Sequence, residues 1–245
     1  MTTTATATTN IESLSEKIIV ALDVATADEA RTLVAELSGK VGAFKIGLQL
    51  FVAAGPEFVR EIAREHRVFL DLKFHDIPNT VANAAVEASK IGVWMMNVHA
   101  IGGREMMGRT VEAVRSTCEN NGVEPPLMIA VTVLTSSDDN VLRETGIESS
   151  VDEQVVRLAK LTKDAGFDGV VASAREASMI RGELGDEFVI VTPGIRAKDA
   201  TNDDQRRVMT FSEAINAGST YAVIGRPITG AADRRAAVDH LLSES

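Results

Sequence analysis

The chain has 245 residues, of which 45% are hydrophobic and 24% are charged, the composition of an ordinary globular protein. That length suits one large domain. The formal net charge of -10 argues against nucleic-acid binding, because a polyphosphate backbone would be repelled. One pocket on an acidic protein can still be locally basic, so a small phosphorylated ligand stays open. The single cysteine, Cys118, excludes an intrachain disulfide and fits a reducing compartment.

The first ten residues, MTTTATATTN, are rich in threonine and contain neither a basic region nor an apolar core. They do not resemble a secretory signal, and we expect residues 1–13 to form a flexible tail. No stretch of the chain approaches the roughly 18 to 20 apolar residues of a membrane span. We therefore expect a cytoplasmic protein that has no contact with a membrane.

Short apolar runs recur along the chain and alternate with segments of helical periodicity. They are nearly continuous in Val, Ile, Leu and Met, as in parallel strands that are covered on both faces. Thr26 and Glu29 form a capping-box pattern before a helix, and Pro56 follows Gly55 where another first turn is expected. The predicted strands are residues 18–23, 43–47, 68–72, 93–99, 127–132, 168–173, 188–192 and 221–225.

Strands that alternate with helices fit either a closed barrel or an open, doubly wound sheet. No glycine-rich dinucleotide fingerprint follows the first strand, where the sequence reads Asp23-Val24-Ala25. The longest irregular segments, 135–150 and 196–210, follow the fifth and seventh strands, where a barrel carries its active-site loops. We therefore predict a single (β/α)8 TIM barrel over residues 14–245, without an internal linker.

Polar residues gather at the carboxyl ends of the predicted strands. Charged side chains within apolar strands are costly to bury unless they are paired, and a purely structural barrel would not need several of them at one mouth. This mouth is where barrel enzymes carry out catalysis. The residues concerned are Asp23, Lys45, Asp71, Lys73, His99, Thr132, Arg196, Gly225 and Arg226.

The strongest local feature is the segment DLKFHDIPNT at residues 71–80. Asp71 and Lys73 point to the same face of an extended strand, and the loop that follows brings in Asp76. Lys45, on the neighbouring strand, can approach Asp71. An alternating array of these charges would keep each lysine protonated and each aspartate ionised. We interpret the array as catalytic rather than as a surface ion-pair network.

The segment 71–80 resembles the signature of the orotidine 5′-phosphate decarboxylase family. Agreement at several separate motifs in the same order makes the resemblance specific, and it extends over nearly the whole chain. The other matching segments are residues 21–23, 44–47, 98–103, 133–136, 191–196, 204–207 and 224–227.

The resemblance implies decarboxylation of orotidine 5′-phosphate to uridine 5′-phosphate, the last step of de novo pyrimidine nucleotide synthesis, without a cofactor or metal. Lys73 would protonate carbon 6 of the pyrimidine, and Asp71 would face the substrate carboxylate. The remaining positions would bind substrate: Asp23, Lys45 and Asp76 with Thr80 at the charged array and the ribose, Thr135 near the base, and Arg196, Gln205, Gly225 and Arg226 around the phosphate.

The resemblance also implies a homodimer in which Asp76 and Thr80 reach the partner's active site. Pro78 stiffens the segment after Asp76, and this loop leaves the third strand at the mouth, where a second subunit could lie.

Two alternatives remain. Magnesium-dependent sugar-phosphate decarboxylases or synthases of the same superfamily share the pattern of Asp71, Lys73 and Asp76, but carry a metal-holding Glu where this chain has Lys45. A lysine there repels a divalent cation, which favours the metal-free enzyme. The second alternative is a nucleotide-binding module without activity, which an intact charged array disfavours. His75 and His99 lack the spacing of a zinc site, and we predict none.

Overall fold

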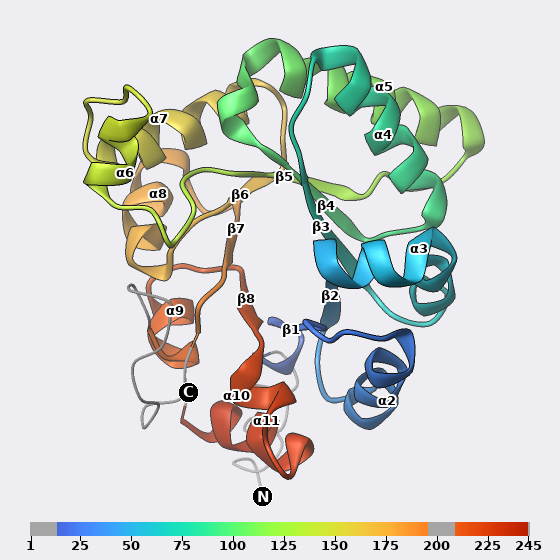
Figure 1. Cartoon of the computed structure of the whole chain (residues 1–245). Coiled ribbons are helices and arrows are strands. Elements are labelled where there is room, and N and C mark those ends of the chain that lie inside the picture. The colour runs from blue at the N-terminus through green and yellow to red at the C-terminus, as the bar shows by residue number, and fades with distance from the viewer. Residues whose placement is uncertain (1–13, 196–208, 245) are drawn as a thin grey trace, which may run out of the picture.

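Parallel strands close into a barrel in chain order in the computed structural model, which describes residues 14–195 and 209–244. Within these ranges β1 pairs with both β2 and β8, so the sheet has no free edge. Figure 1 looks along the barrel, with the strands in the centre. The strands are β1 Ile18–Ala21, β2 Ala43–Gly47, β3 Val68–Phe74, β4 Met95–His99, β5 Leu127–Val131, β6 Gly169–Val171, β7 Val189–Thr192 and β8 Tyr221–Ile224.

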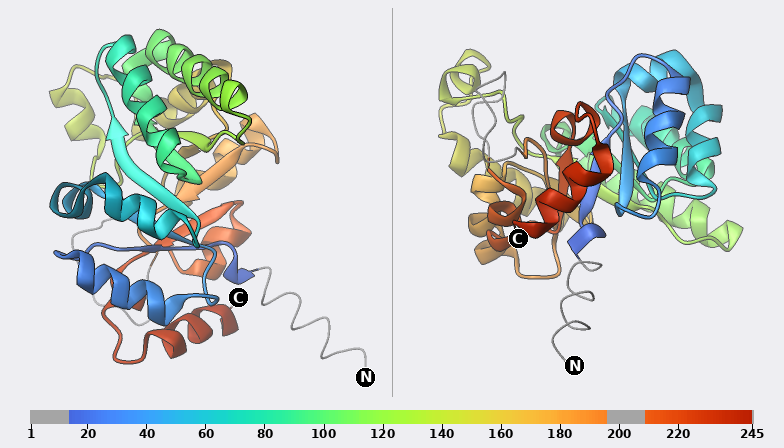
Figure 2. Two further views of the ribbon diagram at one scale, coloured as in Figure 1. Left: turned by 90° about the vertical axis from the view of Figure 1, so that its right-hand side faces the viewer. Right: turned by 90° about the horizontal axis from the view of Figure 1, so that it is seen from below.

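Helices surround the strands as an outer ring (Figure 1). The last helix, α11, packs against α2, as the side views in Figure 2 show. An ion pair between Arg234 and Glu36, with an N–O distance of 2.6 Å, joins the two helices here. The helices are α2 Ala27–Leu37, α3 Leu48–Ala63, α4 Pro78–Ile91, η1 Ala100–Gly102, α5 Gly103–Asn121, α6 Asp139–Glu144, α7 Val151–Asp164, η2 Ala174–Glu176, α8 Ala177–Leu184, α9 Phe211–Asn216, α10 Arg226–Thr229 and α11 Arg234–Ser243. No described helix is long and apolar enough to cross a membrane.

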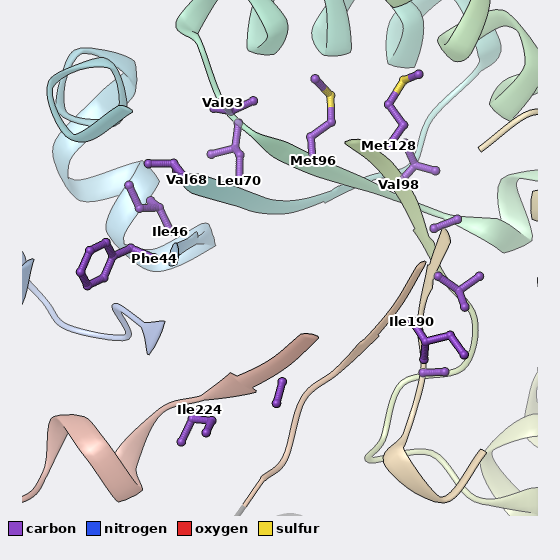
Figure 3. Close-up of a cluster of buried hydrophobic side chains, with 14 of the residues drawn as sticks. Phe44, Ile46, Val68, Leu70, Val93, Met96, Val98, Met128, Ile190 and Ile224 are labelled. Atoms are coloured by element: carbon purple, nitrogen blue, oxygen red, sulfur yellow. The ribbon is translucent and has the colours of Figure 1, made fainter. Parts of the chain in front are cut away.

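The strands separate two apolar cores. Side chains such as Phe44, Leu70 and Met96 point outward and pack under the helices, as Figure 3 shows. Alternate residues point into the barrel, because successive side chains of a strand face opposite ways. The inward cluster consists of Ile19, Ala21, Ala43, Phe69, Met95, Ile129, Val191 and Val223.

The interior changes character toward the carboxyl ends of β2, β3 and β4. Lys45, Asp71 and Asn97 each come two residues after a member of the inward cluster, so they face the same interior. All three are buried. A barrel interior is normally filled by layers of bulky apolar side chains, and here polar groups take part of the layer nearest the mouth.

The eight strand predictions are confirmed, with shifts of one or two residues at their ends, as is the capping box of Thr26 and Glu29. The first turn expected at Pro56 is also confirmed: Gly55, with a φ of 72°, divides α3 into two helical segments, and the second begins at Pro56. Two details differ. β3 runs two residues further than expected, to Phe74. The irregular segment 135–150 contains α6. The predicted tail and most of segment 196–210 lie outside the described residues.

Candidate active site

Asp71 on β3 is the centre of the polar interior, and three groups converge on its carboxylate. Its Oδ1 accepts from Lys73 Nζ at 2.6 Å and from Asn97 Nδ2 at 2.7 Å. Its Oδ2 lies 3.5 Å from Lys45 Nζ. The structure therefore brings together the two lysines and the aspartate that the sequence placed at this mouth.

Lys45 on β2 bridges two carboxylates, that of Asp23 just after β1 and that of Asp71 on β3. Its Nζ donates to Asp23 Oδ1 at 2.9 Å and lies 3.5 Å from Asp71 Oδ2, while the residue is only 8% exposed. A buried ammonium is costly to desolvate, and these contacts offset that cost. The cation occupies the space between the carboxylates, so a divalent metal at the same place would be repelled.

Opposing influences act on the pKa of Asp71. Burial, the largest, disfavours the ionised form and raises the pKa. The charges of Lys45 and Lys73, together with hydrogen bonds from Lys73 and Asn97, outweigh it, so the pKa lies below its usual value of 3.8. Asp71 is therefore an anion at neutral pH, held between two ammonium groups.

Lys73 has an unusual backbone. Its φ is 52°, and among the described residues no other non-glycine residue has a positive φ. The pairing of β3 with β4 shifts register between Leu70 and Phe74 at this point. Lys73 N donates to the side-chain Oδ1 of Asn97 at 2.8 Å. Sequence reasoning missed Asn97, although an asparagine in the apolar run WMMNVH was a visible signal.

Two histidines lie beside Lys73. The rings of His75 and His99 have centroids 5.7 Å apart. Burial lowers the pKa of His99 below 6.5, and the nearby charges of His75 and Lys73 lower it further. Within residues 14–195 and 209–244, no group of three His, Cys, Asp or Glu side chains is arranged to hold a metal ion.

Two adjoining cavities open at the mouth and share Lys45 and Asp71 in their walls. The larger, about 440 Å³, extends past Asp23 to Gly225 and Arg226. The smaller, about 170 Å³, is bounded by Lys73, Thr135 and several apolar side chains. A ligand with an anionic end and a planar, less polar end would match this division.

Other predicted positions lie apart from this array or cannot be placed. Asp76 is exposed on the segment that leads into α4, and Thr80 is exposed in the first turn of that helix. Asp76 Oδ1 accepts from Ile77 N at 2.6 Å, and within the described part of the chain no ion pair joins Asp76 to Lys73. Thr132 donates its hydroxyl to Val171 O at 3.0 Å, a structural role. Arg196 and Gln205 lie outside the described residues.

A closed (β/α)8 barrel with buried charges at the carboxyl ends of its strands, beside open cavities, defines the class: this is a barrel enzyme with its active site at the mouth. The model of the orotidine 5′-phosphate decarboxylase / HUMPS family matches residues 16–241. The chain belongs to this family.

Curated relatives extend the match. The chain is 53% identical over 231 residues to an orotidine 5′-phosphate decarboxylase of Syntrophotalea carbinolica, covering 94% of both chains. It is also 53% identical over 230 residues to that of Geobacter sulfurreducens, covering 94% of this chain and 95% of the relative. A crystal structure of orotidine 5′-phosphate decarboxylase from Lactobacillus acidophilus aligns with a TM-score of 0.81 at 36% identity, over 93% of this chain and 97% of that one.

Proposed function

We propose that the chain decarboxylates orotidine 5′-phosphate to uridine 5′-phosphate and carbon dioxide, the closing step of de novo pyrimidine nucleotide synthesis, in the cytoplasm. The observation that carries the proposal is the buried array in which Asp71 lies between the ammonium groups of Lys45 and Lys73. The names of relatives that are 53% identical over nearly the full chain support the same reaction.

Lys73 supplies the chemistry that this reaction needs. Loss of carbon dioxide leaves negative charge on a vinylic ring carbon that has no adjacent carbonyl to accept it. An ammonium fixed beside that carbon stabilises the charge as it develops and then donates a proton to it. The bond from Lys73 Nζ to Asp71 at 2.6 Å holds the ammonium in place before substrate arrives.

Asp71 acts on the other side of the breaking bond. Its ionised carboxylate would face the carboxylate of the substrate, and two like charges at short range disfavour the bound acid relative to the transition state. The lowered pKa of Asp71 supports this role, since a protonated group would not repel the substrate.

The larger cavity suits the sugar and phosphate. Asp23 and Lys45 would hold ribose hydroxyls, while Gly225 and Arg226 would contact the phosphate at the far end. Thr135, in the smaller cavity, would lie near the base. The family resemblance implies that Arg196 and Gln205 would be further phosphate contacts. Binding energy gained at the phosphate can lower the barrier by positioning the ring.

The reaction is proposed to need no metal. Members of the sugar-phosphate branch hold magnesium with a Glu at the position of Lys45, whereas the Lys45 ammonium lies 2.9 Å from Asp23 and 3.5 Å from Asp71. Activity should therefore survive exhaustive chelation. If the chelator abolished activity and magnesium restored it, the sugar-phosphate alternative would be favoured.

A homodimer is the proposed assembly. Apolar side chains that follow the carboxyl ends of β2, β3 and β4 are exposed: Val52 is 82% exposed, Ile77 66% and Ile101 52%. Such a set on one side of the mouth suits an interface between two copies. Asp76 and Thr80 belong to the same side, so each could enter the site of the partner.

The direct test is an absorbance assay with orotidine 5′-phosphate in the presence of a chelator. Lys73→Ala should remove nearly all turnover and leave the barrel folded, while Lys40→Ala, which removes a half-buried lysine paired with Asp239 away from the mouth, should keep wild-type turnover. If Lys73→Ala kept a tenth of the activity, a change of only about 1.4 kcal/mol in the barrier, Lys73 would not be the proton donor.

Mixing two inactive variants tests the shared site. In a mixed dimer of Lys73→Ala and Asp76→Ala chains, one site carries both changes and the other carries neither. About a quarter of all sites should then be wild type after random exchange at equal concentrations. If subunits exchange and the mixture stays inactive, Asp76 acts within its own chain.

A further inference from the structure

One buried side chain from the neighbouring strand connects both groups that would carry the chemistry. We infer that Asn97 is a positioning residue, which sets the backbone of Lys73 and the orientation of the Asp71 carboxylate. This inference rests on the proposed function. Asn97 is fully buried, and each end of its amide is used: Oδ1 accepts from Lys73 N, and Nδ2 donates to Asp71 Oδ1.

The first contact compensates for a break in the sheet. The ladder between β3 and β4 is irregular between Leu70 and Phe74, so Lys73 has no regular strand partner there. Its φ of 52° is unfavourable for a residue with a Cβ, at a cost of roughly 1–2 kcal/mol. The side chain of Asn97 accepts from the Lys73 N–H at 2.8 Å and so holds this conformation. The Lys73 side chain is aimed by that backbone.

The second contact fixes the carboxylate. Asn97 Nδ2 and Lys73 Nζ both donate to Asp71 Oδ1, at 2.7 and 2.6 Å. The other oxygen, Oδ2, is left facing Lys45 at 3.5 Å. Rotation of the carboxylate would break one of the two hydrogen bonds at Oδ1. The Asn97 amide therefore fixes the orientation of the Asp71 carboxylate relative to the two lysines.

Asn97 acts through these two residues. It does not line either of the two cavities at the mouth, whereas Asp71 lines both and Lys73 lines the smaller one. Loss of its amide should therefore disturb the placement of the reacting groups and leave the nucleotide contacts intact. A displacement of about 1 Å at a reacting group can cost about 100-fold in rate.

Asn97→Ala is the first test. We expect kcat to fall about 100-fold, while the dissociation constant for the product nucleotide, uridine 5′-phosphate, changes less than threefold. Met95→Ala is the matched control: it truncates another inward side chain on β4, two residues earlier, and leaves Asp71 and Lys73 untouched. It should lower stability and keep kcat within threefold of wild type. Equal losses in both variants would mean that Asn97 only supports packing.

Asn97→Asp is the second test and is nearly isosteric, so it can be measured even if the alanine variant does not fold. It keeps an acceptor for the Lys73 N–H but presents a carboxylate to Asp71. Protonation of that carboxylate restores a donor, so the ratio of variant to wild-type kcat should rise as the pH is lowered. The neighbouring titratable groups are Lys45 on β2, Asp71 and Lys73 on β3 and His99 on β4, and the new carboxyl is coupled most closely to Asp71, so the ratio reports the titration of this pair.

The outcomes separate the two proposals. A wild-type chain that does not turn over orotidine 5′-phosphate refutes the proposed function. An active wild type with an Asn97→Ala variant whose kcat stays within threefold refutes the positioning role alone. An Asn97→Asp variant with wild-type kcat at a pH where the new carboxyl is ionised would show that the donor to Asp71 is not needed.

Discussion

Replacing Asp71 with asparagine tests whether the buried array stabilises the fold. The two side chains have nearly the same shape, and the amide oxygen of the variant can still accept from Asn97. What disappears is the one negative charge that lies between Lys45 and Lys73. Lys45 keeps Asp23 as a partner, at 2.9 Å, whereas Lys73 loses the carboxylate with which it forms its ion pair.

The magnitude follows from the distances. With an effective dielectric constant of about 20, attraction across 2.6 Å is worth about 6 kcal/mol and across 3.5 Å about 5 kcal/mol. Most of this is offset by the cost of desolvating three charged groups, and breaking a buried pair typically costs about 3–5 kcal/mol. The side chain of Lys73 is 28% exposed, which places the expected loss at the low end, about 3 kcal/mol.

Urea unfolding at pH 7 measures this loss of unfolding free energy directly. In thermal unfolding, the Tm of a chain of this size should fall by about 10 °C. Asp239→Asn is the control, because it makes the same change in a pair with Lys40 that has an N–O distance of 2.7 Å but is more exposed. That variant should lose less than about 1 kcal/mol. Equal effects would mean that burial adds nothing to the pair.

The pH dependence gives a second check. The pKa of Asp71 is lowered in the folded state, so its ionised form favours folding. This contribution is fully present above the unfolded pKa of about 3.9 and is lost as the pH falls through the folded value. The difference between wild type and Asp71→Asn should stay constant from pH 7 to 5 and shrink below about 4. A variant as stable as wild type at pH 7 would refute the reasoning.

Two further predictions concern the phosphate and the histidine. Arg226→Ala should lower kcat/KM strongly for the nucleotide and hardly at all for the phosphate-free nucleoside, because Arg226 lines the far end of the larger cavity; equal losses on both substrates would place it elsewhere. The lowered pKa of His99 means that the unfolded chain binds a proton first, so stability should decline as the pH falls below about 6.5. The free energy of unfolding measured at pH 7.5 and 5.5 should therefore differ less in His99→Gln than in wild type, by at most about 1.4 kcal/mol per pH unit. If the two proteins lost the same stability between these pH values, the decline would belong to other groups.

The barrel could be predicted because each strand is a short apolar run, and the site could be predicted because several of these runs, such as β2 and β3, carry charged residues toward their carboxyl ends. The same pattern hid Asn97, since one polar residue inside an apolar run gives no sign of which neighbour it contacts. The positive φ of Lys73 was also beyond sequence reasoning, because it depends on the register of β3 against β4. The closeness of Asp76 to Lys73 in sequence predicts Asp76 in the array, yet the turn before α4 directs its carboxylate to the backbone N–H of Ile77. Its contribution to a partner's site stays a prediction.

The polar interior near the mouth has a consequence for protein engineering. Lys45, Asp71 and Asn97 occupy positions that large apolar side chains fill in the core of an ordinary barrel. Exchanging a buried ionic group for well-packed hydrophobic residues of similar volume is often neutral or stabilising by about 1–4 kcal/mol. Single apolar substitutions would leave an unpaired buried charge, so stability screens on this chain should select apolar replacements of these positions in combination, and the hits would be more heat-resistant and inactive. Any library that aims at a sturdier enzyme has to hold these three positions fixed.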